Sequence, residues 1–331
     1  MALRVEFCYN GQTKICPEEP GGSEVFRKMK KWTAILLAIA LLVCFSAAAE
    51  EAEQSYVENE WNYVDGSMDV SNGIPDNASG VLARIRETGV LRVATEPHFA
   101  PQEFIDPDLE GQATYAGADM ELARLIAERM GVELEIIPMD FTDVLPAAAE
   151  DKCDLVISAL SFTPARTMSN EMSKGYFFTD MPANITMVIR AEDAETITKV
   201  EDLADKTLVA QRSSLQEAVV VDRIHRYKEF RRVKQTQEVY ETVASGKADA
   251  GAVDMENAEI YIRNNPDCGL VLVEGLRFTL EEQYAGDRIA AKKGETMLMY
   301  FVNGVIDEVV DSGKYSEWYA DALKRADELD L

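Results

Sequence analysis

The stretch SALSFTPARTMS, which begins at Ser158, joins hydroxyl side chains to a single arginine where a predicted strand ends and a helix begins. Thr163 is a typical N-cap residue and Pro164 suits the first helical position, so Arg166 falls in the first turn. A cation there opposes the helix dipole, which favours negative charge at that end. A small carboxylate could be bound there by free amide hydrogens, the guanidinium and the hydroxyls of Ser158, Ser161 and Thr163. From these residues alone, a solvated surface arginine is the alternative.

Common signatures of catalysis are missing from the 331-residue sequence. It contains no HExxH, CxxC, P-loop or GxGxxG motif, and its two histidines, His98 and His225, are far apart in the sequence. The net charge of −26 disfavours nucleic acid as a partner, because phosphate binding needs clustered lysine and arginine. We find no nucleophile–base pair and no set of metal ligands. These absences argue against the commonest zinc, redox and nucleotide chemistries without excluding them, and we expect no catalytic turnover, no cofactor and no metal.

The N-terminal part of the chain contains a typical export signal. Two lysines precede an apolar stretch, residues 34–45, and a small-residue site that ends at Ala49. Residues 29–49 therefore predict a bacterial-type signal peptide that is cut after Ala49, and the mature protein is expected outside the cytoplasm. Only Cys153 and Cys268 remain after cleavage, which is too few for a disulfide framework.

Two other roles for this segment stay open. The uncharged run 32–49 has a borderline length for an uncleaved membrane anchor. Cys44 could carry a lipid, although Val43 is larger than the residue that such a site prefers. Residues 1–28 fit none of these signals, and we interpret them as a misassigned extension, with translation starting at Met29.

From residue 80 onward the sequence alternates between helix and strand patterns. The residues before it, 50–79, are acidic with glycine and asparagine breaks and predict a linker, part of which could dock through its aromatic residues. The predicted elements are, in order, helix 81–89, strand 90–95, helix 118–131, strand 132–139, a short helix 143–151 and strand 154–158; then strand 207–211, helix 214–224, helix 240–246, strand 249–254 and helix 255–264; and finally strand 283–294, helix 295–311 and a helix around 315–326. Such alternation is typical of βαβ units and a mainly parallel sheet.

These elements predict two α/β lobes. The first comprises residues 80–189 and the second residues 190–284, and the C-terminal part, 285–331, could return to the first lobe. The chain is expected to cross between the lobes near Arg190 and near Tyr284.

Six segments, in this order and spacing, carry a resemblance to a known family: LRVATEPHFAPQEF, GADMELARLIAERMGVELE, FTDVLPAAAEDKCDLVISALSFTPAR, VEDLADKTLVAQRSS, GKADAGAVD and DSGKYSEWY. The chain resembles the type 3 extracellular solute-binding proteins, the amino-acid receptors of bacterial ABC importers, from about residue 81 to about residue 329. The resemblance implies a two-lobed periplasmic-binding-protein-like fold of type II, with two crossing strands and a ligand cleft between the lobes. It also implies a monomer that delivers a polar amino acid to a membrane permease.

The resemblance assigns roles to residues at the ends of the predicted strands. Arg166 corresponds to the family arginine that binds the ligand α-carboxylate, and Ser161 and the backbone near Ser158 and Ala159 correspond to positions that add hydrogen bonds. Asp254 corresponds to the aspartate that pairs with the α-ammonium. It could equally cap the following helix, and one carboxylate can do both.

Five further residues match ligand-contacting positions of the family. Phe99 and Phe141 match the aromatic residues that flank the ligand side chain, with ordinary packing as the alternative. Glu96 matches a position that is often acidic where the ligand side chain is cationic, or is a solvated loop carboxylate. Ser213 and Ser214 match the helix start that meets the carboxylate in the second lobe. Ser214 also begins a capping box with Glu217.

Three departures from the family pattern leave the ligand open. Ala118 stands where the family usually has an aromatic residue, just before Asp119, which could widen the pocket. Ser213 replaces a glycine and follows Arg212. An arginine beside the cleft would favour an acidic ligand side chain, whereas Glu96 would favour a cationic one.

Two other functions use the same fold. A cyclohexadienyl dehydratase-like enzyme would need a carboxylic acid in the cleft to protonate a leaving hydroxyl, a role open to Glu96, Glu103 or Asp140. A ligand-sensing domain would instead feed a signalling partner, and we expect no transducing domain after Leu331.

Overall fold

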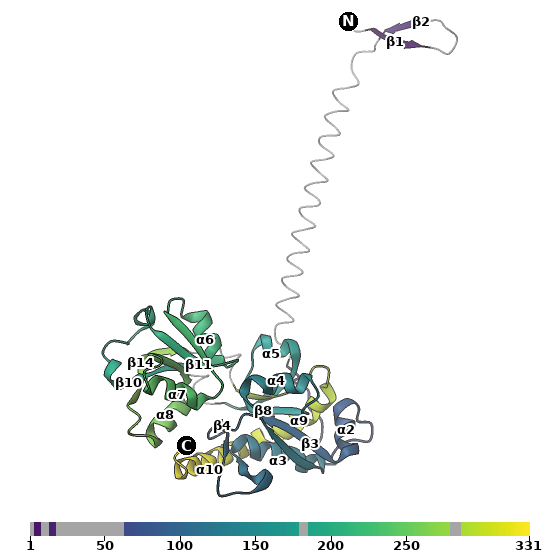
Figure 1. Cartoon of the computed structure of the whole chain (residues 1–331). Helices are drawn as coiled ribbons and strands as arrows, with labels where there is room; N and C mark the ends of the chain where they lie inside the picture. Colours follow the sequence, from purple (N-terminus) through teal and green to yellow (C-terminus); the bar gives the residue numbers. More distant parts are fainter. Residues whose placement is uncertain (1–2, 8–12, 18–62, 179–184, 279–285) are drawn as a thin grey trace. The chain divides into compact units, whose positions relative to one another are not determined.

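The computed structural model describes residues 3–7, 13–17, 63–178, 185–278 and 286–331 (Figure 1). The chain divides into two compact units, residues 1–60 and 61–331. In the first unit, β1 (Leu3–Phe7) pairs antiparallel with β2 (Thr13–Pro17). The predicted signal peptide, with Cys44 and Ala49, lies outside the described residues. No helix in the described part of the chain is both long enough and apolar enough to cross a membrane.

The second unit contains two five-stranded sheets, each with helices packed on it, which we call the first and second lobes. The first sheet has the order β7-β3-β8-β15-β9. Only β15 runs against its neighbours, so the sheet is mainly parallel, as predicted. Its strands are β3 (Val90–Thr95), β7 (Glu133–Pro138), β8 (Leu155–Ser161), β9 (Asn170–Phe177) and β15 (Asp287–Lys292).

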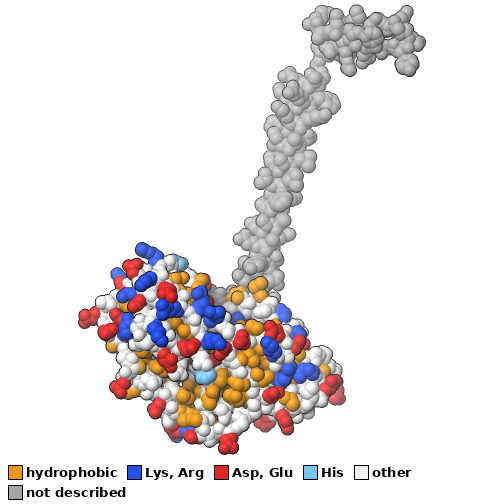
Figure 2. Space-filling model, in the orientation of Figure 1, with side chains coloured by type: hydrophobic (Ala, Val, Ile, Leu, Met, Phe, Trp, Pro, Cys, Tyr) orange, Lys and Arg blue, Asp and Glu red, His pale blue; other side chains and the backbone are white. Residues whose placement is uncertain are grey.

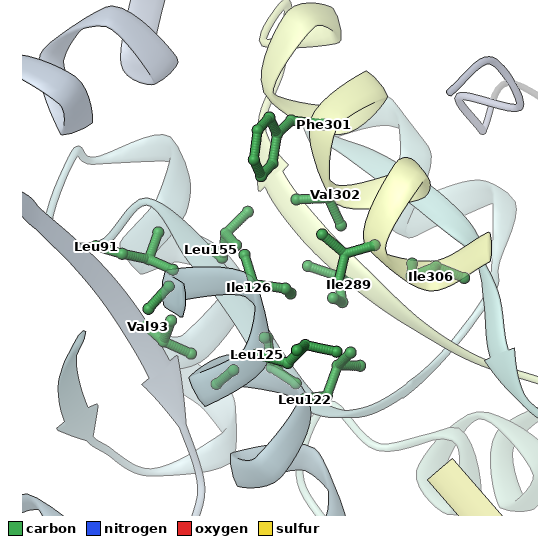
Figure 3. Packing of buried hydrophobic residues seen from close by; sticks show 14 of the residues in the cluster. Leu91, Val93, Leu122, Leu125, Ile126, Leu155, Ile289, Phe301, Val302 and Ile306 are labelled. Carbon is green, nitrogen blue, oxygen red and sulfur yellow. The ribbon is translucent and has the colours of Figure 1, made fainter. Parts of the chain in front are cut away.

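Helices cover both faces of the first sheet. They are α2 (Gly80–Thr88), α3 (Ala118–Met130), α4 (Phe141–Ala149), α5 (Pro164–Ser169), α9 (Thr296–Ser312) and α10 (Lys314–Glu328). Side chains alternate along β8: Leu155 and Ile157 pack with α3 and α9 (Figure 3), while Val156 packs with α4. The helix α3 ends at Gly131, whose φ of 70° suits glycine.

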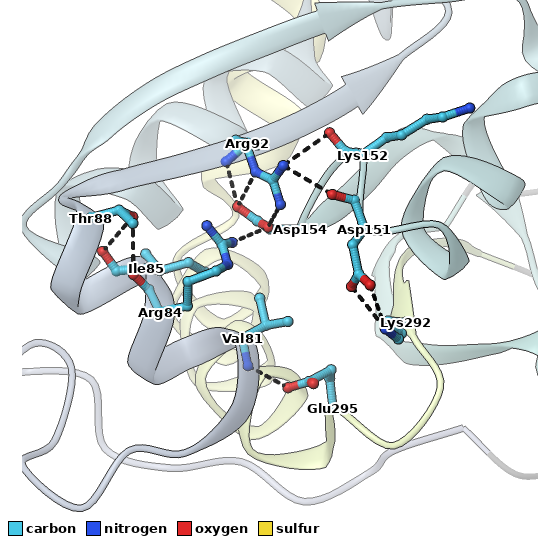
Figure 4. A network of polar contacts seen from close by, with 10 residues as sticks. All are labelled: Val81, Arg84, Ile85, Thr88, Arg92, Asp151, Lys152, Asp154, Lys292 and Glu295. Atoms are coloured by element: carbon cyan, nitrogen blue, oxygen red, sulfur yellow. Dashed lines mark hydrogen bonds and ion pairs between the residues drawn. The ribbon is translucent and has the colours of Figure 1, made fainter.

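A network of charges holds the ends of β3 and β8 that lie opposite the cleft (Figure 4). Asp154, just before β8, is 2% exposed. It accepts hydrogen bonds from the backbone amide of Arg92 (2.9 Å) and from its Nη2 (2.8 Å), and it also pairs with Arg84. Because one carboxylate joins β3, β8 and α2, the network holds the register that places the other ends of these strands.

The second sheet has the order β12-β11-β13-β10-β14, with only β10 running against its neighbours. Its strands are β10 (Ile185–Arg190), β11 (Thr207–Gln211), β12 (Glu229–Val233), β13 (Ala250–Asp254) and β14 (Leu270–Phe278), and its helices are α6 (Leu215–Arg223), α7 (Thr236–Ala244) and α8 (Met255–Asn264). These elements are green in Figure 1. The two lobes together form the two-lobed α/β fold that the resemblance implied.

Short elements complete the two lobes. The small sheet β4 (His98–Phe99), β5 (Glu103–Ile105) and β6 (Tyr115–Ala116) follows β3. Single 3-10 turns lie at η1 (Gly111–Thr114), η2 (Ala191–Asp193) and η3 (Val200–Leu203).

The chain changes sheets twice. It leaves the first sheet after β9 and enters the second at Ile185, five residues before the crossing expected near Arg190. It leaves the second sheet after β14 and returns to the first at Asp287. The other crossing expected, near Tyr284, lies outside the described residues.

Residues 63–70, which we call the strap, pack against the first lobe. The Asn303 side chain donates to the carbonyls of Val64 (2.7 Å) and Gly66 (2.8 Å), and Met68 N donates to Tyr300 O (3.0 Å). Val70 is 3% exposed in the core of the first lobe. This part of the segment expected to be a linker, 50–79, is therefore docked on the domain.

Candidate ligand-binding cleft

Side chains from both lobes line one cavity of about 860 Å³ that is open to solvent. Nine of the ten predicted site residues line it: Glu96, Phe99, Phe141, Ser158, Ala159, Ser161, Arg166, Ser214 and Asp254. Ser213 does not line this cavity. Its φ of 62° is left-handed, which explains why the family has glycine there, and its carbonyl faces Arg166 Nη2 at 3.5 Å.

Arg166 sits where the sequence places it, in the first turn of α5. The Thr163 hydroxyl accepts from the Arg166 amide (3.2 Å), as expected of the N-cap. The guanidinium donates from Nη1 to Ser161 O (2.7 Å) and lies 5.7 Å from the centre of the Phe141 ring. Burial lowers the pKa of Arg166 to about 10, so the side chain stays cationic at neutral pH. Among the described residues that line the cavity, it is the only lysine or arginine.

The backbone of β8 turns sharply beside Arg166. Ala159 has a φ of 44°, and its amide donates to Asp119 Oδ2 (2.8 Å). The Ser158 hydroxyl accepts from Glu96 N (3.1 Å) and donates to Glu103 Oε1 (2.9 Å). The Ala159 amide, which the resemblance had assigned to the ligand, and the Ser158 hydroxyl, which the residues alone had suggested for it, are thus engaged within the first lobe.

Two buried carboxyl groups, Glu103 and Asp119, lie at the cavity: Glu103 lines it, and Asp119 contacts the backbone of the lining residue Ala159. Asp119 accepts hydrogen bonds from the hydroxyls of Tyr176 (2.9 Å) and Tyr315 (2.6 Å) as well as from the Ala159 amide. Burial, and then the charge of Asp119, raises the pKa of Glu103 well above its usual range. Burial raises the pKa of Asp119 as well, and the hydrogen bonds from Tyr315, Ala159 and Tyr176 oppose that rise.

Asp254 ends β13 and caps α8, where its side chain accepts from Asn257 N (3.0 Å), so the capping role is confirmed. Burial raises the pKa of Asp254 to about 6. Glu96 contacts His98 Nδ1 at 2.7 Å, and this hydrogen bond raises the pKa of His98. The sequence had left Glu96 open as a solvated loop carboxylate, but its side chain is 2% exposed.

Several lining residues were not among those predicted: Gln102, Glu103, Phe177, Ile185, Gln211, Leu215, Gln216, Glu256, Gly286 and Asp287. Half of them come a few residues after a predicted site residue in the sequence. Gln211 instead ends a predicted strand, β11. Asp287 is different, because it opens β15 and only the pairing of that strand brings it to the cleft. Burial raises the pKa of Asp287 well above its usual range, and the charges of Asp119 and Asp254 add to this.

Polar contacts join the two lobes beside the cleft. Lys234 Nζ lies 2.6 Å from Asp140 Oδ2, and Asn257 donates from its side-chain Nδ2 to Ala100 O (2.9 Å). Asp140 is therefore paired at the rim and is absent from the cavity lining. On the face shown in Figure 2, basic side chains lie among acidic ones.

The described residues contain neither a group of metal ligands nor a pair of bonded cysteines. No group of three or more His, Cys, Asp or Glu side chains there could hold a metal ion. Cys153 packs in the first lobe and Cys268 in the second, and both are free. Burial raises the pKa of the Cys153 thiol to about 12, which makes it unreactive.

Comparisons with known proteins agree with this geometry. The family model described as bacterial extracellular solute-binding proteins, family 3, matches residues 91–324. The arginine-binding extracellular protein ArtP of Bacillus subtilis is 26% identical over 227 residues, which cover 68% of this chain and 82% of that protein.

Two solved structures illustrate the range of similar proteins. The L-arginine-bound substrate-binding protein AbpA of Streptococcus pneumoniae has a TM-score of 0.66 and 31% identity, and the match covers 74% of this chain and 98% of that chain. The ancestral amino acid-binding protein AncCDT-1, a precursor of cyclohexadienyl dehydratase, has a TM-score of 0.63 and 26% identity, and the match covers 74% of this chain and 100% of that chain.

Proposed function

Because the chain belongs to the bacterial extracellular solute-binding proteins of family 3, we propose that it captures a cationic L-amino acid outside the cytoplasm and delivers it to an ABC-type permease. Export through a signal peptide over residues 29–49 is part of this proposal, as is function as a monomer. AbpA and ArtP, whose names state that they bind arginine, support the choice of ligand class.

The charge of the cavity lining carries the proposal. Among the described residues of the lining, the ionisable side chains are one base, Arg166, and five carboxyl groups, those of Glu96, Glu103, Asp254, Glu256 and Asp287. The head group of an α-amino acid needs one cation and one carboxylate. Arg166 and Asp254 satisfy that need, and the remaining acidic groups favour a ligand with a second positive charge.

The two head-group residues belong to different lobes, which suggests how binding is signalled. The guanidinium of Arg166 in the first lobe offers a planar fork to the α-carboxylate, and Asp254 in the second lobe takes the α-ammonium. A ligand that touches both lobes stabilises the closed arrangement over the open one. The permease would then read closure as the sign of a loaded receptor.

Thermal unfolding in the presence of each of the twenty standard amino acids, L-ornithine, L-citrulline and prephenate tests the ligand class. Arginine, lysine, ornithine or histidine is expected to raise the unfolding temperature, since a ligand at about a hundred times its Kd adds about 2.7 kcal/mol of stability. Stabilisation only by acidic or neutral amino acids would contradict the cationic assignment.

Incubation of the protein with prephenate tests the enzyme alternative. Glu103 favours it, because a carboxyl group whose pKa is raised by burial lines the cavity and could protonate a leaving hydroxyl. AncCDT-1 shows that a similar fold can precede a dehydratase. We propose that Glu103 is structural instead, since it is bonded to Ser158. Conversion of prephenate to phenylpyruvate at an enzyme-like rate would overturn this view.

Binding of L-arginine is expected to weaken about tenfold between pH 7 and pH 5. Asp254, with a pKa of about 6 in the empty cleft, must lose its proton to pair with an ammonium group. Affinity therefore rises as pH increases through 6 and is lost below it. Calorimetric titration at pH 5, 6 and 7 measures the effect, and Asp254→Asn should bind weakly with a flatter profile. A higher affinity at pH 5 than at pH 7 would rule out this role for Asp254.

A further inference from the structure

Where they line the cleft, the two lobes have the same arrangement of strands. In each, the chain arrives from the other lobe and begins a strand that runs against its neighbours, β10 in the second lobe and β15 in the first. Ile185 begins β10 and pairs with Asp254 on one side. Asp287 begins β15 and pairs with Ser161 on one side and Phe177 on the other. Ile185 and Asp287 thus hold equivalent positions, and both line the cavity.

This equivalence shows that the fold does not require a carboxylate at the start of such a strand. The second lobe fills the position with an isoleucine that is 1% exposed. The first lobe instead places Asp287 near Arg166, Asp119 and the two acidic groups of the second lobe, Asp254 and Glu256. An acidic side chain among four charged groups, three of them acidic, destabilises the empty protein.

Asp287 also lacks a partner of its own among the described residues. Its carboxylate makes no hydrogen bond or ion pair with any of them, and no ion pair joins it to Arg166, whose Nη1 donates to Ser161 O. A partly buried carboxylate that is unpaired in the empty cleft is well placed to bind a cation supplied by a ligand.

Resting on the proposed function, we infer that Asp287 selects for ligand charge, its carboxylate pairing with the ammonium or guanidinium group of the ligand side chain. The other acidic groups of the lining are already engaged. Glu96 pairs with His98, Glu103 with the Ser158 hydroxyl, and Asp254 caps α8. Glu256 lies in the first turn of α8, where the helix dipole already stabilises a negative charge.

L-Arginine and L-citrulline provide a sharp test, because they are nearly identical in shape and differ in side-chain charge. The wild-type protein should prefer arginine. In Asp287→Asn, arginine should bind about thirtyfold more weakly while citrulline binds as well as before or better, since a charge-assisted pair is replaced by a neutral contact. Glu87→Gln removes one negative charge from an exposed position on α2 of the same lobe, and it should leave the preference unchanged.

Each outcome of the titrations decides the assignment. An unchanged ratio of the affinities for arginine and citrulline in Asp287→Asn would overturn it. If the ratio stayed the same because both affinities fell equally, Asp287 would lie at the shared α-ammonium instead. The proposed function would survive either result. That function fails separately if the wild-type protein binds none of arginine, lysine, ornithine and histidine. Thermal unfolding shows whether the variant is folded, and Asp287→Ser replaces it if the asparagine variant is not.

Discussion

Replacing Arg166 with alanine should weaken the binding of L-arginine by about thirtyfold to a few thousandfold, because truncating one partner of a desolvated charge pair costs roughly 2–5 kcal/mol. Arg166 is 9% exposed, and no other described residue of the cavity lining carries a cation that can meet an α-carboxylate. Arg166→Lys should recover only part of the affinity, since an ammonium cannot reproduce the planar fork or reach Ser161 O and the ligand together.

Calorimetric titration of both variants measures the loss, and L-citrulline provides a useful comparison. Because citrulline shares the α-carboxylate, Arg166→Ala should weaken it as severely as arginine, in contrast to Asp287→Asn. Lys234→Ala removes a cation at the rim, paired with Asp140 outside the cavity, and should change the affinity far less. Affinities of Arg166→Ala and Arg166→Lys close to that of the wild type would show that the carboxylate is bound elsewhere.

A protein that begins at Ser79 should be less stable than one that begins at Tyr63, by a free energy of unfolding on the order of 3 kcal/mol. The shorter protein lacks Val70, which is 3% exposed in the core of the first lobe. It also lacks the hydrogen bonds that Asn303 and Tyr300 make to the strap. For a domain of this size, the loss corresponds to a fall of roughly 6–12 °C in unfolding temperature.

A single substitution can undock the strap without shortening the chain, which separates the effect of docking on stability from the effect of chain length. Gly304 on α9 lies so close to the strap that an added Cβ would come within 2.2 Å of Met68 O, so Gly304→Val should displace the strap and lower the unfolding temperature in the longer protein. Asn72→Ala, at an exposed position between the strap and α2, is the control and should have little effect. Equal stability of the two proteins that begin at Ser79 and Tyr63 would mean that the strap contributes nothing to the fold.

The sequence predicted the elements whose pattern is local. The strands predicted at 90–95 and 207–211 coincide with β3 and β11, and the N-caps of α5 and α6 are the predicted Thr163 and Ser214. These elements carry their own signals in apolar periodicity, a proline or a capping residue.

Strands without such signals were missed. β12 is an edge strand with the sequence EFRRV, where charge interrupts the apolar pattern, as is common at sheet edges. β14 contains Gly275, a residue that usually argues against a strand. An added Cβ there would lie 2.5 Å from Thr198 O, so close packing with another part of the chain explains this glycine. Neither that contact nor the order of strands in a sheet is visible in a single sequence.

The same limit applies to the cleft. Arg166 and Asp254 were predicted because each lies at the start of a predicted helix or the end of a predicted strand, where ligands of α/β sheets gather, and Ser161 was predicted through the resemblance. Asp287 fell within a predicted strand, 283–294, but nothing local shows which residue of that strand reaches the cleft. Its place follows from pairing with Ser161 and Phe177, more than 100 residues earlier in the chain.

The register of the two sheets also determines which motions the lobes can make. Phe177 and Asp287, where the two connections meet the first lobe, are paired neighbours, and so are Ile185 and Phe278, where they meet the second. With a single connection, one lobe could rotate about it in any direction. Two connections, fixed about one strand spacing apart at each end, resist such rotation and leave bending about one axis as the soft coordinate. Rotation in the other two directions would pull the paired strand ends apart, so we expect bending to be the easiest motion between the lobe that carries Arg166 and the lobe that carries Asp254.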